Sequence, residues 1–191
     1  MVKLKQSIKL KIINIFMVVG SVMQGSKIYS LDPVIDSNSR VLILGTMPGV
    51  ESLSKGQYYA NERNQFWHIM SSVLNIEFPN DYPRKINILK NHKIALWDVI
   101  HVCERVGSLD SNIKYEEPND IESLLKNYPT IKLIVFNGSK AFKVFKKHIG
   151  FKLFSGVDFE RLPSTSATPG KNVKTFEEKV EDWSIIKNYI S

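Results

Sequence analysis

Residues with aromatic and hydrogen-bonding side chains gather just after the apolar run at 41–44. The run leads into a Gly-Thr-Met-Pro-Gly turn, whose members are Gly45, Thr46, Met47, Pro48 and Gly49. Two tyrosines, two asparagines and an arginine follow it: Tyr58, Tyr59, Asn61, Arg63 and Asn64. Aromatic faces, amides and a cation beside a sharp turn suit a flat, polar, π-bearing ligand such as a nucleobase.

Short apolar segments alternate with helical patterns and must position these residues. Apolar runs with polar or glycine borders predict strands at 40–44, 94–99, 131–136 and 159–162. Apolar residues at helical spacing predict helices at 64–74, 120–127, 139–148 and 175–190. The alternation favours an α/β fold of three layers, α/β/α, with a central, mostly parallel four-stranded sheet. The turn at 45–49 then lies at the carboxyl edge of the sheet, where such folds bind ligands.

Composition limits the possible classes of protein. The 191 residues, 43% of them hydrophobic, suffice for one domain with a substantial core. The single cysteine, Cys103, excludes an internal disulfide and a four-thiolate iron–sulfur cluster. The four histidines lack the spacing of a zinc site. We therefore expect no metal and no cofactor.

The positive charge is unevenly distributed. The net charge is +7, but Lys3, Lys5, Lys9 and Lys11 supply four positive charges before residue 23, which leaves +3 for the rest. A mildly basic domain fits weak, reversible binding of a polyanion better than a tight clamp.

Residues 1–26 are predicted to be an extension, and residues 27–191 the functional domain. The lysine-rich start and the apolar run at 12–19 have the outline of a secretory signal. Against this, Asn14 interrupts the run and no Ala-x-Ala site follows. The alternative is a dispensable extension or an early start codon, with Met23 as a candidate start.

Five ordered segments resemble the uracil-DNA glycosylase superfamily. They are the turn, Gln-Tyr-Tyr-Ala-Asn-Glu-Arg-Asn-Gln-Phe-Trp, Leu-Trp-Asp-Val, Cys-Glu-Arg-Val-Gly-Ser-Leu-Asp-Ser and Leu-Pro-Ser-Thr-Ser, at 45–49, 57–67, 96–99, 103–111 and 162–166. The resemblance is closer to the mismatch-specific branch and to the hypoxanthine-DNA glycosylases called family six. It covers roughly residues 27 to 190, and the matching order and spacing make it specific.

The resemblance implies a DNA glycosylase that hydrolyses the N-glycosidic bond of a deaminated base, hypoxanthine first and uracil second. It implies a cytoplasmic, monomeric protein whose partner is DNA with a damaged base. The alternative is a non-catalytic DNA- or nucleotide-binding protein of the same fold. An acyl hydrolase is disfavoured because no Gly-x-Ser-x-Gly turn is present.

The catalytic role falls on Asn64 by resemblance. In much of the superfamily a polar residue two places after the first glycine of the turn handles the attacking water, but here that residue is Met47. In hypoxanthine-specific relatives the asparagine of the Arg-Asn-x-Phe-Trp run is essential, and that asparagine is Asn64. A neutral amide is not a general base, so we expect Asn64 to orient water or contact the base. Capping of the next helix is a compatible alternative.

Other roles also follow from the resemblance. Tyr59 is expected to stack on the flipped base, and the turn at 45–49 to contact it; a core position is the alternative for Tyr59. Tyr58, Phe66 and Trp67 are assigned to the core. Asp98 is a hypothetical acceptor for the ring N–H that hypoxanthine and uracil share, with a turn-capping role as the alternative.

DNA contacts are expected from the segment at 162–166, through Ser164, Thr165 and Ser166, and from Asn137. The chain departs from the family pattern at Thr46, Asn61, Glu62 and residues 167–170. Glu62 adds a negative charge near the expected DNA path.

Overall fold

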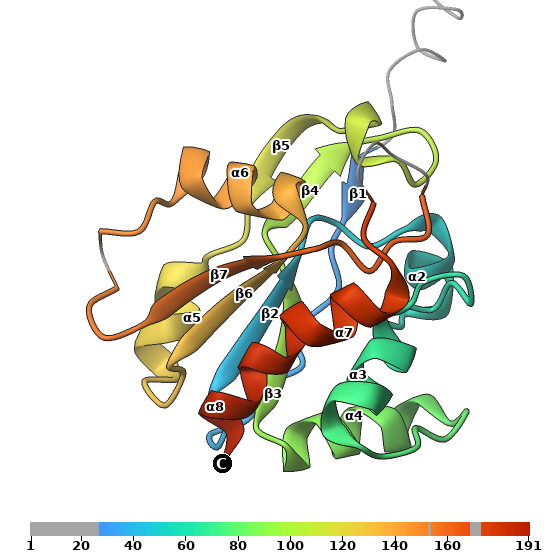
Figure 1. Cartoon of the computed structure of the whole chain (residues 1–191). Helices are drawn as coiled ribbons and strands as arrows, with labels where there is room; N and C mark the ends of the chain where they lie inside the picture. Colours follow the sequence, from blue (N-terminus) through green and yellow to red (C-terminus); the bar gives the residue numbers. More distant parts are fainter. Residues whose placement is uncertain (1–26, 153, 169–172) are drawn as a thin grey trace, which may run out of the picture.

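The structure is a computed structural model that describes residues 27–152, 154–168 and 173–191. A four-stranded sheet forms its centre (Figure 1). Its strands are β3 (Ile94–Asp98), β2 (Val41–Gly45), β6 (Leu133–Asn137) and β7 (Asp158–Leu162), in that spatial order. Every neighbouring pair is parallel. The predicted sheet is confirmed, with strand ends shifted by one or two residues.

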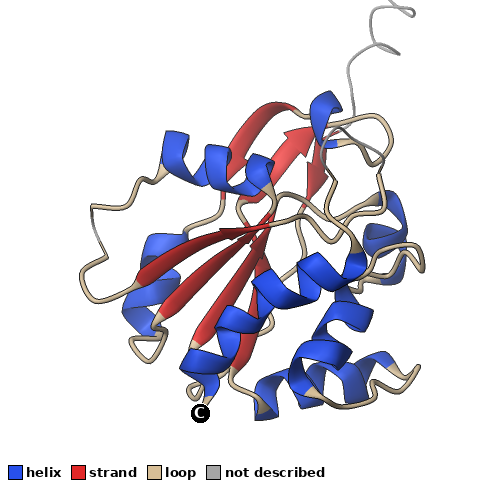
Figure 2. Cartoon of the chain, viewed as in Figure 1, coloured by secondary structure: helices blue, strands red, loops and turns tan. Residues whose placement is uncertain are grey.

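Helices cover both faces of this sheet (Figure 2). Leu42, Leu44 and Phe136 pack in one core with residues of α5 (Ile121–Asn127) and α6 (Ser139–His148). Val41 and Ile43 point the other way, into a second core with residues of α3 (Phe66–Leu74), α4 (Tyr82–Asn91) and α7 (Phe176–Trp183). Alternate residues of one strand thus serve opposite faces, which explains why β2, β3 and β6 are largely apolar; β7 also carries Asp158, Glu160 and Arg161. The three-layer prediction is confirmed.

A second sheet was not predicted. It is antiparallel, in the order β1 (Lys27–Tyr29), β4 (Ile100–Glu104) and β5 (Lys114–Pro118). Only Val99 separates β3 from β4. The chain leaves one sheet and enters the other within a single apolar run, so hydrophobicity alone gives no sign of the boundary.

Two helices are also additions to the predicted set, α2 (Val50–Lys55) and α4. The start of α4 had a sequence signal, because Asp81 caps it by accepting from Arg84 N and Pro83 follows in the first turn. The predicted helix at 175–190 consists of α7, a 3₁₀ turn at Ser184–Ile186 and α8 (Lys187–Ile190). Within the described ranges, no helix has the length and apolar character needed to cross a membrane.

Candidate nucleobase and DNA site

The ends of the four parallel strands form one row at the carboxyl edge of the sheet. Asp98 lies opposite Gly45 in the β3–β2 register, and Asn137 lies opposite Leu162 in the β6–β7 register. Leu44 pairs with Phe136, so Gly45 and Asn137 are neighbours in the middle of the row. The backbone therefore brings together three residues that were predicted to contact substrate.

The turn at 45–49 is packed into the protein more deeply than expected. Met47 is only 6% exposed and belongs to the core that contains α5 and α6, so its side chain has a packing role. Thr46 is also buried, and its hydroxyl donates to Asp110 Oδ2 at 2.8 Å. In this conformation the backbone of the turn is better placed than its side chains to contact a base.

The loop that follows β4 holds the turn in place. Arg105 donates to the carbonyl oxygen of Pro48, and Ser108 Oγ accepts from Val50 N at 3.0 Å. The 103–111 segment resembles the family pattern, but no role was predicted for it. The buried Arg105 guanidinium keeps Nε and Nη1 without a hydrogen-bond partner among the described residues.

Asp98 is buried directly behind the turn. A Cβ on Gly45 would collide with Asp98 Oδ1, so only glycine permits this close approach. Ser30 Oγ donates to Asp98 Oδ2 at 3.3 Å. Burial, with a smaller contribution from the negative charge of Asp110, raises the pKa of Asp98 to about 7 despite the opposing effects of Ser30 and Arg105.

Contacts hold the ring, the hydroxyl and the backbone carbonyl of Tyr59. Its ring stacks on Phe66, with centroids 3.7 Å apart and planes 12° from parallel. Its hydroxyl accepts from Asn137 Nδ2 at 3.1 Å, and its carbonyl accepts from Trp67 Nε1 at 3.2 Å. The backbone φ is +53°, an unfavourable value for a bulky residue. Phe66 occupies one face of the ring, so a base can stack only on the other.

Asn137 joins Tyr59 to the segment at 162–166. Its Oδ1 accepts from Thr165 N at 2.9 Å, and its Nδ2 also donates to Thr165 Oγ1 at 2.9 Å. Thr165 has no exposed surface, which favours a structural role for this member of the predicted DNA-binding set. Ser164 is exposed and remains available to DNA; it lies against Gly138, where a Cβ would approach Ser164 Cβ to 3.0 Å. Ser166 is half-buried.

Asn64 lies just before α3. Its Oδ1 accepts from Phe66 N at 3.0 Å, so the helix-capping contact exists. Its Nδ2 makes no hydrogen bond to a described residue, and the side chain lines a cleft of about 640 Å³. Tyr59 lines the same cleft, together with Tyr58, Trp67, His68 and Tyr82. The predicted catalytic residue and the predicted stacking residue thus share one cavity of a size that ligand sites commonly have. Tyr58 and Phe66 are buried, as assigned, whereas Trp67 is half-buried.

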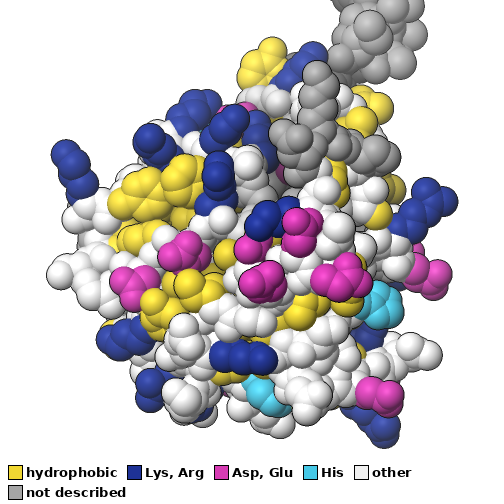
Figure 3. All heavy atoms as spheres, in the orientation of Figure 1, with side chains coloured by type: hydrophobic (Ala, Val, Ile, Leu, Met, Phe, Trp, Pro, Cys, Tyr) yellow, Lys and Arg dark blue, Asp and Glu magenta, His cyan; other side chains and the backbone are white. Residues whose placement is uncertain are grey.

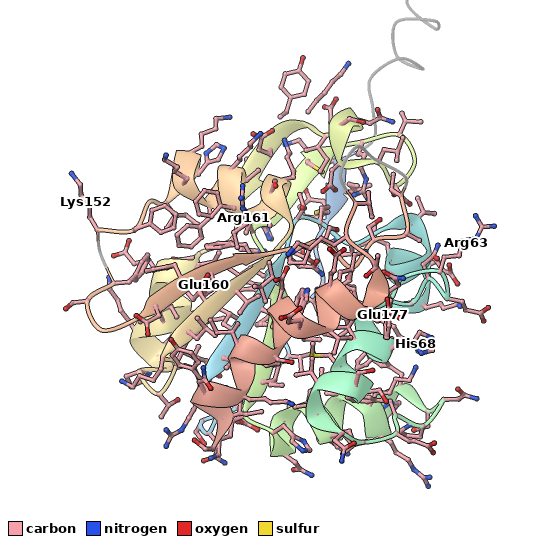
Figure 4. All side chains as sticks on the ribbon, in the orientation of Figure 1. Arg63, His68, Lys152, Glu160, Arg161 and Glu177 are labelled. Carbon is pink, nitrogen blue, oxygen red and sulfur yellow. The ribbon has the colours of Figure 1, made fainter. Side chains whose placement is uncertain are left out.

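Charge is segregated over the surface. In Figure 3, Lys and Arg side chains gather over α6, and Asp and Glu side chains gather over α7. Arg63 and His68 project away from the body on the side of α2 and α3 (Figure 4). The cleft that Asn64 lines carries both signs of charge, from Lys55 and Lys85 and from Glu62 and Glu77.

Fold and site together define a protein of the uracil DNA glycosylase superfamily. The model of that superfamily matches residues 33–187, so the chain belongs to this family and to its class of enzymes, the DNA glycosylases. The resemblance seen in the sequence is confirmed.

Two relatives and one solved structure are similar to this chain over more than half of its length. A hypoxanthine DNA glycosylase of Methanosarcina acetivorans is 36% identical over 156 residues, which are 80% of this chain and 93% of the relative. A protein of the same name from Methanosarcina barkeri is 41% identical over 110 residues, 57% of this chain and 70% of the relative. The chain is also similar to a solution NMR structure of a candidate uracil DNA glycosylase from Methanosarcina acetivorans. The TM-score is 0.69 at 32% identity, with 84% of this chain and 96% of the other covered.

Proposed function

We propose that this protein hydrolyses the N-glycosidic bond of hypoxanthine in DNA, with uracil as a second substrate. The main support is the cleft that Asn64 and Tyr59 share, which the Tyr59 hydroxyl links to Asn137 at a strand end. Two similar proteins carry the name hypoxanthine DNA glycosylase, which favours hypoxanthine over other lesions. A glycosylase must extrude the nucleotide from the duplex, at a cost of a few kcal/mol, so it needs a surface that receives the flipped base.

Tyr59 provides that surface. Its ring is fixed by Phe66 and Asn137, so stacking of a base on the free face costs little further ordering. Asn64 lines the same cleft, and its Oδ1 is tied to the start of α3, which leaves Nδ2 without a partner among the described residues. The fixed amide orients water or donates to the base as negative charge develops on the leaving group.

Asp98 supplies the proposed discrimination between bases. A carboxylate accepts the N1–H of hypoxanthine or the N3–H of uracil, whereas N1 of unprotonated adenine has no proton to donate. Asp98 is buried in this structure, so contact with a base requires the turn at 45–49 to move. If an Asp98→Ala enzyme still distinguishes hypoxanthine from adenine, the assignment is wrong.

One assay tests the activity. A labelled oligonucleotide with a single hypoxanthine is incubated with the protein, and abasic sites are then cleaved with alkali. We expect strand breaks with the wild type and with Asn91→Ala, a control at the exposed end of α4. We expect a loss of about 100-fold or more with Asn64→Ala, because positioned groups commonly contribute that much. Binding without breaks in the wild type would instead indicate the non-catalytic alternative.

We further propose that the protein acts as a monomer in the cytoplasm. The row of strand ends and the cleft both come from a single chain, which supports the monomer. Light scattering at the concentration of the activity assay tests it.

A further inference from the structure

Lys179 is a buried ammonium next to the predicted catalytic loop. It lies on α7, is 3% exposed, and donates from Nζ to Gln65 Oε1 at 2.8 Å. Among the described residues, no carboxylate lies within 4.0 Å of it, and burial lowers its pKa. A buried charge with a neutral partner is uncommon, because few interactions offset the loss of its hydration.

This contact fixes the orientation of the Gln65 amide. The ammonium can only donate, so it binds the oxygen of the amide and directs Nε2 the other way. Nε2 makes no hydrogen bond to a described residue, and it is absent from the buried, unpaired side-chain atoms of the described chain. The amide nitrogen is therefore not fully buried, and its donors have no partner among the described residues. Donation from an ammonium to the oxygen also polarises the amide and makes the N–H groups stronger donors.

Gln65 occupies a central place in the site. It directly follows Asn64, and its backbone N–H donates to the carbonyl oxygen of Thr165 at 2.9 Å. Thr165 in turn binds Asn137, which holds Tyr59. The backbone of Gln65 thus joins the loop that carries Asn64 to the segment that carries the exposed Ser164.

We propose that Gln65 Nε2 donates to a phosphodiester oxygen of the DNA strand that carries the damaged base, and that Lys179 acts as a positioning residue for this amide. Phosphate oxygens receive the larger share of protein–DNA hydrogen bonds, and glutamine is among their usual donors. The inference rests on the proposed function only in taking DNA as the ligand.

Gln65→Glu separates a DNA contact from a structural role. Glutamate keeps an acceptor for Lys179 and adds an ion pair, so the melting temperature should stay the same or rise. The donor toward DNA is lost, so we expect the Kd for an undamaged duplex to rise about tenfold, the equivalent of one charge-assisted hydrogen bond. Asn188→Asp on α8 makes the same change in net charge on an exposed surface and should leave Kd unchanged. Wild-type Kd in Gln65→Glu would overturn the proposal.

A substrate-side experiment identifies the acceptor even if Gln65→Glu is unstable. Single phosphates of a hypoxanthine oligonucleotide are replaced one at a time by neutral methylphosphonates, and binding by the wild type and Gln65→Met is compared. We expect one position at which the wild type loses affinity and Gln65→Met does not. No such position would mean that Gln65 donates elsewhere, and the phosphate assignment would fall.

The role of Lys179 is tested by a double-mutant cycle. Lys179→Met should weaken DNA binding about threefold in the wild type, because the amide becomes free to rotate, and should have no effect in the Gln65→Met background. Equal effects in both backgrounds would contradict positioning through Gln65. The binding readout needs no turnover, so a wild type that binds DNA but releases no base would refute the proposed activity and leave this inference standing.

Discussion

At the scale of single residues, Tyr59 shows how the site is prepared before substrate arrives. Its positive φ costs on the order of 1–3 kcal/mol and persists because Phe66, Trp67 and Asn137 hold the ring, carbonyl and hydroxyl. Strain maintained by three separate contacts is consistent with a residue placed for function.

Two substitutions at Tyr59 separate its ring from its hydroxyl. Tyr59→Phe keeps the aromatic face and loses only the bond from Asn137, so we expect single-turnover base release within a few-fold of the wild type. Tyr59→Leu removes the face, worth ~1–3 kcal/mol of base stacking, and should slow release by about 10- to 100-fold. Equal rates for the two variants would mean that the ring does not stack on the base.

Asp98 makes the stability of the protein depend on pH. Its folded-state pKa, about 7, exceeds the ordinary value of 3.8, so its protonated form favours the folded state. That contribution is complete below about pH 4 and is lost as the pH rises to 7, with a slope of at most about 1.4 kcal/mol per pH unit. Asp98→Asn has no such titration. The free energy of unfolding of this variant, relative to the wild type, should therefore rise between pH 5 and pH 8 in denaturant titrations. A constant difference would mean that Asp98 is not perturbed.

At the scale of elements, the approach of the 162–166 segment to α6 depends on Gly138. This residue has φ +95°, and a Cβ would lie 3.0 Å from Ser164 Cβ. Gly138→Ala should lower the free energy of unfolding by about 1–3 kcal/mol and also weaken DNA binding, because Ser164 must shift. Gly156→Ala is the matched control, since its φ is +79° but nothing lies within 4 Å of the added carbon. Gly156→Ala should lower the free energy of unfolding, measured by chemical denaturation, and should leave the affinity for DNA unchanged.

At the scale of the whole molecule, the sequence predicted the central sheet because β2, β3 and β6 are largely apolar and supply side chains to both cores, while β7 contributes Phe159 and Leu162. It did not predict the antiparallel sheet, whose strand β5, Lys-Tyr-Glu-Glu-Pro, is mostly exposed and has no apolar pattern.

Asn64 and Tyr59 could be selected from the sequence as candidate site residues because both belong to one contiguous motif. The contact of Lys179 with Gln65 joins residues 114 positions apart, and no local pattern reports it. The contact of Arg105 was not predicted for a related reason. It donates to the carbonyl oxygen of Pro48, and a backbone oxygen leaves no pattern in the sequence.

The register of the parallel strands has a consequence for how such a site can diversify. Asp98, Gly45 and Asn137 each lie at a strand end, while the residues before them in β3, β2 and β6 pack in the two cores. A substitution at a strand end alters the chemistry presented to the base and leaves both cores intact. An inserted residue within a strand would turn its core side chains to the wrong face. The architecture therefore permits new base preferences through point substitutions at Asp98 and Asn137, while Gly45 must remain glycine and changes in strand length are resisted.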